Sequence, residues 1–153
     1  MFRTRLEHAF KDVGLNARDH CVFLPRLAPD RFVAAIGQSD VVLDSIGWSG
    51  CNSILESLAH NLPIVTLAGE MMRGRHTAAI LDMMDVRETM ARTIDEYVSI
   101  AGFLGRTTAK RTELSAEIAN KKHCVYRDHA CIAALQTFLD RAVRDKAAPL
   151  CSM

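Results

Sequence analysis

The residues best suited to chemistry lie in one short segment, residues 44–56, with the sequence DSIGWSGCNSILE. Gly47 and Gly50 permit turn geometries closed to other residues and let a ligand approach the backbone closely. If a helix begins near Cys51, the amides of residues 51–53 have no partner inside that helix and point outward. Such amides bind anions, so the segment predicts a site for a diphosphate.

Glu56 lies one helical turn beyond these amides, where its carboxylate is placed to accept both hydroxyls of a ribose attached to the diphosphate. The side chains of Asn52 and Ser53 add polar atoms at the start of the same helix. A helix dipole contributes roughly 0.3–1 kcal/mol per anion and each charged hydrogen bond about 1.5–3 kcal/mol. These terms are large enough to matter even without a lysine.

Each of these residues also has a purely structural alternative. Ser53 and Glu56 fit a capping box, in which the glutamate satisfies a backbone amide. The two glycines are equally consistent with a simple turn, and Asp44 with a cap on that turn. Both readings of the segment are open at this point.

The surrounding pattern predicts the elements that hold this segment. Short apolar runs at 21–24, 41–43 and 64–67 read as strands, and Asn61 as a left-handed helix cap. Helical periodicity covers 2–13, 30–38, 51–60, 75–84, 94–105, 108–121 and 128–145. Buried strands alternating with helices favour parallel pairing and an α/β layered fold. Three strands are few for such a sheet, so we expect the amino-terminal part of a larger domain to be absent.

Composition favours a folded domain over a disulfide-rich, secreted or membrane-spanning protein. The 153 residues are 49% apolar and 24% charged with a net charge of +1, which favours one folded domain and no nucleic-acid or membrane partner. Five irregularly spaced cysteines do not form a disulfide framework, and no signal peptide or spanning segment is recognisable. We therefore expect a cytoplasmic protein, with a domain over residues 1–145 and a flexible tail over 146–153.

Three segments together resemble a known family. They are FLPRLAPDRF, DVVLDSIGWSGCNSILESLAHNLPIVTLAGE and RGRHTAAIL. They look like the C-terminal catalytic region of the O-GlcNAc transferase and SPINDLY group, glycosyltransferase family 41. The resemblance extends over about residues 22–103, with a weaker continuation to Leu139. It implies a Rossmann-like domain, the C-terminal half of a two-domain GT-B fold that transfers a sugar to serine or threonine hydroxyls.

The resemblance also assigns site residues. Gly50, Cys51, Asn52 and Ser53 stand in the place of the family's phosphate loop, and Glu56 in that of its ribose-binding acid. Backbone groups of Leu27 would read the edge of the base, Phe32 would stack on it, and Arg75 matches an arginine of the family pattern. The implied donor is UDP-GlcNAc or another UDP- or GDP-sugar, with no cofactor and a protein as the acceptor.

Several departures from the family pattern bear on activity. Asn52 and Ser53 replace two threonines, Cys51 replaces a glycine or histidine, and Pro29 and Phe32 replace a lysine and a histidine beside the base. The identity of the base is therefore open. Because the family's N-terminal catalytic half is missing, we expect no sugar transfer by this chain alone and assign no catalytic residue. That missing half is an expected partner of the chain. The alternative is a non-catalytic remnant that serves as an interaction module and binds another protein or itself.

Two other groups of residues have side chains that could bind a ligand. His123, Cys124, His129 and Cys131 are metal-ligand types, but their spacing matches no common zinc pattern, so we expect structural roles and no metal. Arg73, Arg75 and His76 follow the strand at 64–67 and are expected at the same edge as the phosphate loop. For the arginines, a solvated or helix-capping role is the alternative.

Overall fold

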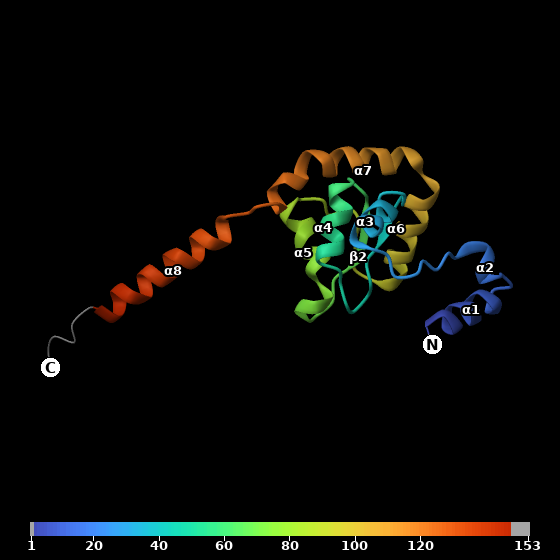
Figure 1. Ribbon diagram of the computed structural model, residues 1–153, viewed down its shortest axis with the longest axis horizontal. Coiled ribbons are helices and arrows are strands. Elements are labelled where there is room, and N and C mark those ends of the chain that lie inside the picture. Colours follow the sequence, from blue (N-terminus) through green and yellow to red (C-terminus); the bar gives the residue numbers. More distant parts are fainter. Residues whose placement is uncertain (1, 148–153) are drawn as a thin grey trace. The chain divides into compact units, whose positions relative to one another are not determined.

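A computed structural model describes residues 2–147 of the protein (Figure 1). Side chains are described as far as Arg144. It divides into two compact units after Ala34. The predicted tail, 146–153, lies outside the described residues except for 146 and 147, which belong to the last helix. None of the described helices is both long enough and apolar enough to cross a membrane.

The first unit is helical. It holds α1 (Phe2–Asp12), α2 (Ala17–His20) and most of α3 (Pro29–Ile36). The Phe10 and His20 rings stack 5.6 Å apart, and the Arg3 guanidinium lies 4.3 Å from the centre of the Phe23 ring. The strand predicted at residues 21–24 is wrong, because this segment pairs with no strand and leaves Val22 87% exposed. Its apolar residues therefore do not form part of a sheet.

The second unit contains a parallel sheet of three strands in the order β1-β2-β3. These strands are β1 (Val42–Leu43), β2 (Ile64–Leu67) and β3 (Met90–Ala91). Val42 pairs with Ile64 and Thr66 pairs with Met90, which fixes the register. The α/β prediction is confirmed, but its third strand is β3, which is too short to show a periodic pattern.

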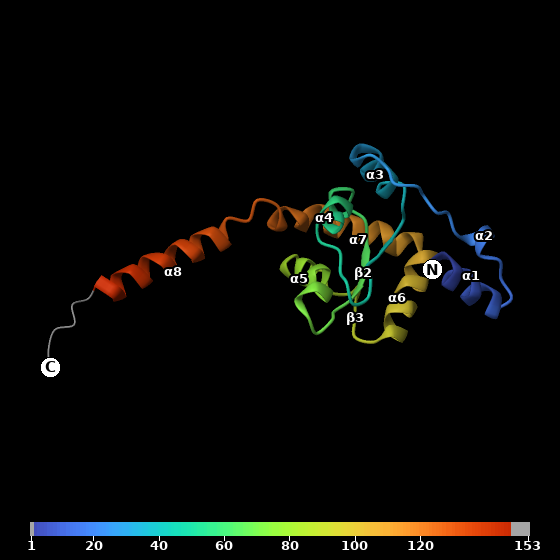
Figure 2. The same ribbon diagram turned by 60° about the horizontal axis from the view of Figure 1, so that its bottom comes forward.

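Helices follow the strands and cover both faces of the sheet. They are α4 (Asn52–Ala59), η1 (Met72–Gly74), α5 (His76–Met83), α6 (Ile94–Arg106), α7 (Thr108–Lys121), η2 (Lys122–Val125) and α8 (Ala130–Ala147). Figures 1 and 2 both show the strands between α5 and α6. Ile64, Val65 and Thr66 of β2 are fully buried, as expected for a central parallel strand.

Several helices begin or end at residues whose type favours capping. The Thr93 hydroxyl accepts the Glu96 amide at 3.1 Å and caps α6, while the Asp128 carboxylate accepts the Ala130 amide at 2.8 Å before α8. Asn61 has φ +60°, which confirms the left-handed cap expected after α4. The apolar core is formed by Ile54, Leu58, Ile64, Val65, Leu81, Met84, Val86, Leu104, Leu114 and Ile118.

Helix α5 offers a direct test of this core. Leu81 is fully buried, whereas Met83 on the same helix is 54% exposed. Leu81→Ala leaves a cavity and should lower the free energy of unfolding by about 2–5 kcal/mol, while Met83→Ala should change it by less than about 0.5 kcal/mol. Urea denaturation followed by circular dichroism measures both. Equal effects of the two substitutions would contradict the packing of α5 described above.

Candidate functional site

The Asp44 carboxylate organises the carboxyl edge of the sheet. It follows β1 directly and is 5% exposed. One oxygen accepts the hydroxyls of Ser49 and Thr66, each at 2.8 Å, and the other accepts the Gly50 amide at 2.8 Å. A buried carboxylate that receives three hydrogen bonds fixes both of the backbone segments that supply them. Asp44 therefore holds the loop after β1 against the neighbouring strand β2.

Ser49 extends this network to the loop after β2. Its hydroxyl oxygen accepts the Thr77 amide at 2.9 Å and lies 2.8 Å from the Thr77 hydroxyl oxygen. Its amide donates to the Arg73 carbonyl at 2.7 Å, and the Gly69 amide donates to the Gly74 carbonyl at 2.8 Å. The loops that follow β1 and β2 are therefore joined through side chains and backbone. The start of α5 has a fixed position relative to the start of α4.

The two glycines of the loop after β1 are required for different reasons. Gly47 has φ +85°, a left-handed conformation that other residues rarely adopt. Gly50 lacks a positive φ, but a Cβ there would lie 2.9 Å from both Ser53 Oγ and Ile54 Cγ1. The expectation of special turn geometry thus holds at Gly47. At Gly50 the requirement is close packing.

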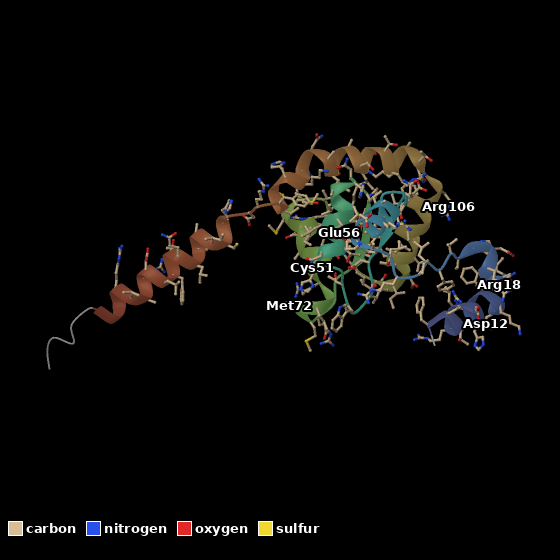
Figure 3. All side chains as sticks on the ribbon, viewed as in Figure 1. Asp12, Arg18, Cys51, Glu56, Met72 and Arg106 are labelled. Atoms are coloured by element: carbon tan, nitrogen blue, oxygen red, sulfur yellow. The ribbon has the colours of Figure 1, made fainter. Side chains whose placement is uncertain are left out.

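The amino end of α4 presents free amides. The helix begins at Asn52, and Cys51 at its N-cap makes no side-chain capping hydrogen bond. Among the described residues, the amides of Cys51, Asn52 and Ser53 have no acceptor. The capping-box alternative is therefore wrong, because Ser53 lies inside the helix and its amide donates no hydrogen bond to the Glu56 carboxylate. Figure 3 shows Cys51 at the start of α4 and Glu56 further along the same helix.

A cavity of about 560 Å³ lies over these amides. It is lined by residues 42–45, residues 48–54 and His76. Its walls therefore come from the end of β1, the following loop, the start of α4 and the start of α5. Both oxygens of Asp44, the single carboxylate among these residues, already accept hydrogen bonds from the protein.

Two predicted site residues lie near this cavity but do not line it. Glu56 is half-buried on α4 and Arg75 is exposed at the N-cap of α5. Within the described part of the chain, neither side chain makes an ion pair or a hydrogen bond. The structure therefore brings Gly50, Cys51, Asn52 and Ser53 together around the cavity, whereas Glu56 and Arg75 are not among its lining residues.

The other two predicted residues belong to the first unit. Leu27 is half-buried in the segment before α3, and Phe32 on α3 is 42% exposed. The Phe32 amide donates to the Ala28 carbonyl at 2.9 Å, in the first turn of this helix. Their assignment to the base remains a prediction from the sequence.

Sequence reasoning did not identify several residues of the network. Thr66 lies in a predicted apolar strand and Thr77 in a predicted helix. The sequence around them does not indicate that either hydroxyl joins the Asp44 network. Tyr97 of α6 donates from its hydroxyl to the Asp44 carbonyl at 2.9 Å. Burial, and to a lesser extent the negative charge of Asp44, raise the pKa of the Tyr97 hydroxyl above its usual value. The phenol therefore stays a donor at neutral pH.

The metal-ligand types near the end of α7 do not form a cluster. In the part of the chain that the structure describes, no group of three or more His, Cys, Asp or Glu side chains is placed to hold a metal ion. The Cys124 thiol lies 3.4 Å from the Met83 carbonyl, and His123 Nδ1 lies 3.0 Å from the Asn120 carbonyl oxygen. Cys124 therefore contacts the backbone at the end of α5, and His123 contacts the backbone of the preceding helical turn.

Comparisons with known proteins extend this description. Residues 3–128 match the family model for Glycosyl transferase family 41. The SPINDLY protein of Hordeum vulgare, described as a probable UDP-N-acetylglucosamine–peptide N-acetylglucosaminyltransferase, is 32% identical over 75 residues. That match covers 49% of this chain and 8% of the relative.

A solved structure is similar over most of the chain. A mutant of the O-GlcNAc transferase of Thermobaculum terrenum matches with a TM-score of 0.76 and 31% identity. The match covers 93% of this chain and 28% of that enzyme. The parallel sheet and its helices are therefore a part of the fold found in a much longer glycosyltransferase.

The Asp44 network generates a stability prediction. Asp44→Ala leaves the Ser49 and Thr66 hydroxyls and the Gly50 amide without their acceptor, and should lower the free energy of unfolding by about 2–4 kcal/mol. Asp82→Ala is the matched control, since it removes an exposed ion pair with Arg87 and should cost at most about 1 kcal/mol. Chemical denaturation measures both values.

Amide hydrogen exchange at Gly50 provides a local readout for the same variants. It should accelerate in Asp44→Ala and stay unchanged in Asp82→Ala, because only Asp44 accepts the Gly50 amide. Unchanged protection of Gly50 in Asp44→Ala would show that this carboxylate does not hold the loop.

Proposed function

The chain belongs to glycosyltransferase family 41, and from this premise we propose that its second unit binds the nucleoside diphosphate part of a nucleotide sugar. The observation that carries the proposal is the set of three free amides, those of Cys51, Asn52 and Ser53, at the floor of an open cavity. Free amides at a helix start favour phosphate oxygens. In parallel sheets such ligands bind at the carboxyl ends of the strands, where this cavity lies.

The pre-arranged loop supports binding of a diphosphate without a lysine. Asp44 and Ser49 hold Gly50 and the start of α5 in place, so the amides need not be ordered when the ligand binds. The Asn52 and Ser53 side chains line the same cavity and add donors. Two helices, α4 and α5, begin at its wall, and their amino ends favour negative charge.

Glu56 and Arg75 complete the proposed site. Glu56 accepts the two ribose hydroxyls from its position one turn along α4, where no described side chain pairs with it. Arg75 follows η1 at the same edge and approaches the diphosphate or the sugar. Base contacts by Leu27 and Phe32 are proposed on the family resemblance alone.

The reaction of the whole protein is proposed on family membership. The chain spans 28% of the Thermobaculum terrenum enzyme and 8% of the Hordeum vulgare relative, so sugar transfer is assigned to a larger protein. We propose a UDP- or GDP-sugar as donor and a protein hydroxyl as acceptor on the family resemblance. The name of the Hordeum vulgare relative, a probable UDP-N-acetylglucosamine–peptide N-acetylglucosaminyltransferase, supports a nucleotide-sugar donor and a peptide acceptor. Within that reaction, this chain contributes recognition of the donor.

Nucleotide binding can be measured through the single tryptophan. Trp48 lines the cavity and is 72% exposed, so a ligand there should change its fluorescence. We expect saturable binding of UDP or GDP by the intact chain. Glu56→Gln should weaken the better ligand about tenfold while leaving its 2′,3′-dideoxy analogue unaffected, since only the ribose hydroxyls contact the carboxylate.

Glu113→Gln is the control for this experiment. It makes the same charge change on α7, outside the cavity lining, and should leave nucleotide affinity unchanged. Isothermal titration calorimetry gives an independent value of each affinity. Absence of binding by UDP, GDP and their sugars would refute the proposed function. Equal weakening of the ribose and dideoxy ligands by Glu56→Gln would refute the role of Glu56 alone.

A further inference from the structure

His76 occupies a fixed position at the cavity wall. It is the first residue of α5, and the next residue, Thr77, is fully buried and hydrogen-bonded to Ser49. Ser49 in turn donates to Asp44, which accepts the amide of Gly50. The network that holds the phosphate loop therefore also sets where His76 stands relative to it. His76 is the one residue of α5 that lines the cavity.

The surroundings of the imidazole determine which nitrogen carries its proton. His76 Nδ1 is buried and has no hydrogen-bond partner within residues 2–147. A proton on Nδ1 would be a buried donor without an acceptor, which is the less favourable of the two arrangements. The favoured neutral tautomer therefore carries its proton on Nε2.

Nε2 is the ring nitrogen that remains available to a ligand. It is not among the buried unpartnered atoms of the described chain, and no hydrogen bond to it is found there. It therefore meets solvent, on a side chain that lines the cavity. The imidazole presents an N–H donor from α5, in addition to the amides presented by α4.

The groups proposed to bind the ligand come from two helices, α4 and α5, that both border the cavity. Glu56, the proposed ribose acceptor, lies along α4, and the amides of residues 51–53 lie at the amino end of that helix. His76 lines the same cavity from a different helix, α5. A ligand whose ribose lies at Glu56 and whose first phosphate lies at the α4 amides reaches α5 with its second phosphate. That phosphate is the one that bears the sugar.

We propose that His76 is a donor-binding residue whose Nε2–H hydrogen-bonds to the sugar-bearing phosphate of the nucleotide sugar. The proposal rests on the proposed function and adds a specific contact to it. No covalent step is involved, because the imidazole donates a hydrogen bond to an oxygen that carries negative charge. The contact distinguishes a nucleoside diphosphate from a monophosphate, since only the former extends to α5.

The test compares monophosphate and diphosphate ligands in matched variants of the intact chain. UDP and GDP, with UMP and GMP, are titrated against the wild type, His76→Ala, His76→Gln and the control His129→Ala, and Trp48 fluorescence and calorimetry report binding. His76→Ala should weaken the diphosphate about tenfold and change the monophosphate by less than about twofold. His76→Gln places an amide N–H near the position of Nε2 and should restore most of the affinity. His129 is exposed before α8 and outside the cavity, so its substitution should have no effect.

Each outcome decides a different question. If the wild type binds neither diphosphate, the proposed function fails and this contact fails with it. If the wild type binds a diphosphate and His76→Ala binds it equally well, the contact is refuted while the function stands. Equal weakening of monophosphate and diphosphate would place His76 at the first phosphate and overturn the assignment. A thermal unfolding scan of each variant, with His76→Gln as the second substitution, excludes loss of fold as the cause.

Discussion

The buried carboxylate of Asp44 is the interaction on which the carboxyl edge of the sheet depends. A sheet with two-residue outer strands gives little backbone pairing to hold its loops. Asp44 compensates by joining Ser49 and Gly50 of its own loop to Thr66 of the neighbouring strand. Ser49 then carries the connection to Thr77 and α5. The cavity thus has walls fixed by side chains as well as by the sheet.

No lysine or arginine among the described side chains lines the cavity, and the arrangement supports the proposal that it binds an anion without one. The donors are backbone amides at the start of α4, and their positions are set before any ligand arrives. Fixed dipoles stabilise charge without the reorganisation that flexible cationic side chains require. Polar groups buried beneath the loop are satisfied mostly by one another, whereas the groups above it are left for a ligand. The Gly50 amide donates to Asp44, whereas the amides of the next three residues have no acceptor among the described residues.

Elements with enough residues to show a period were predictable from sequence. The bounds of α7 were predicted from its apolar spacing, as was the left-handed conformation of Asn61 from its place after a helix. Strand β3 has two residues, too few for any pattern, and the apolar run at residues 21–24 has no sheet partner. At the site, the free amides followed from helix geometry, since every helix start leaves them. The contacts of Thr66 and Thr77 could not be predicted in this way. Thr66 lies 22 residues from its partner Asp44, and Thr77 lies 28 residues from its partner Ser49.

The hydrogen bonds between Ser49 and Thr77 also constrain how such a sequence can change over evolutionary time. Each residue satisfies a buried polar group of the other, so the first substitution at either position leaves an unpaired atom. A second substitution at the partner position, of matching shape, relieves that cost, and the two effects are not additive. We therefore expect substitutions at Ser49 and Thr77 to occur together. The loop itself is free to vary at an exposed position such as Ile46, whose side chain takes no part in the network and does not line the cavity.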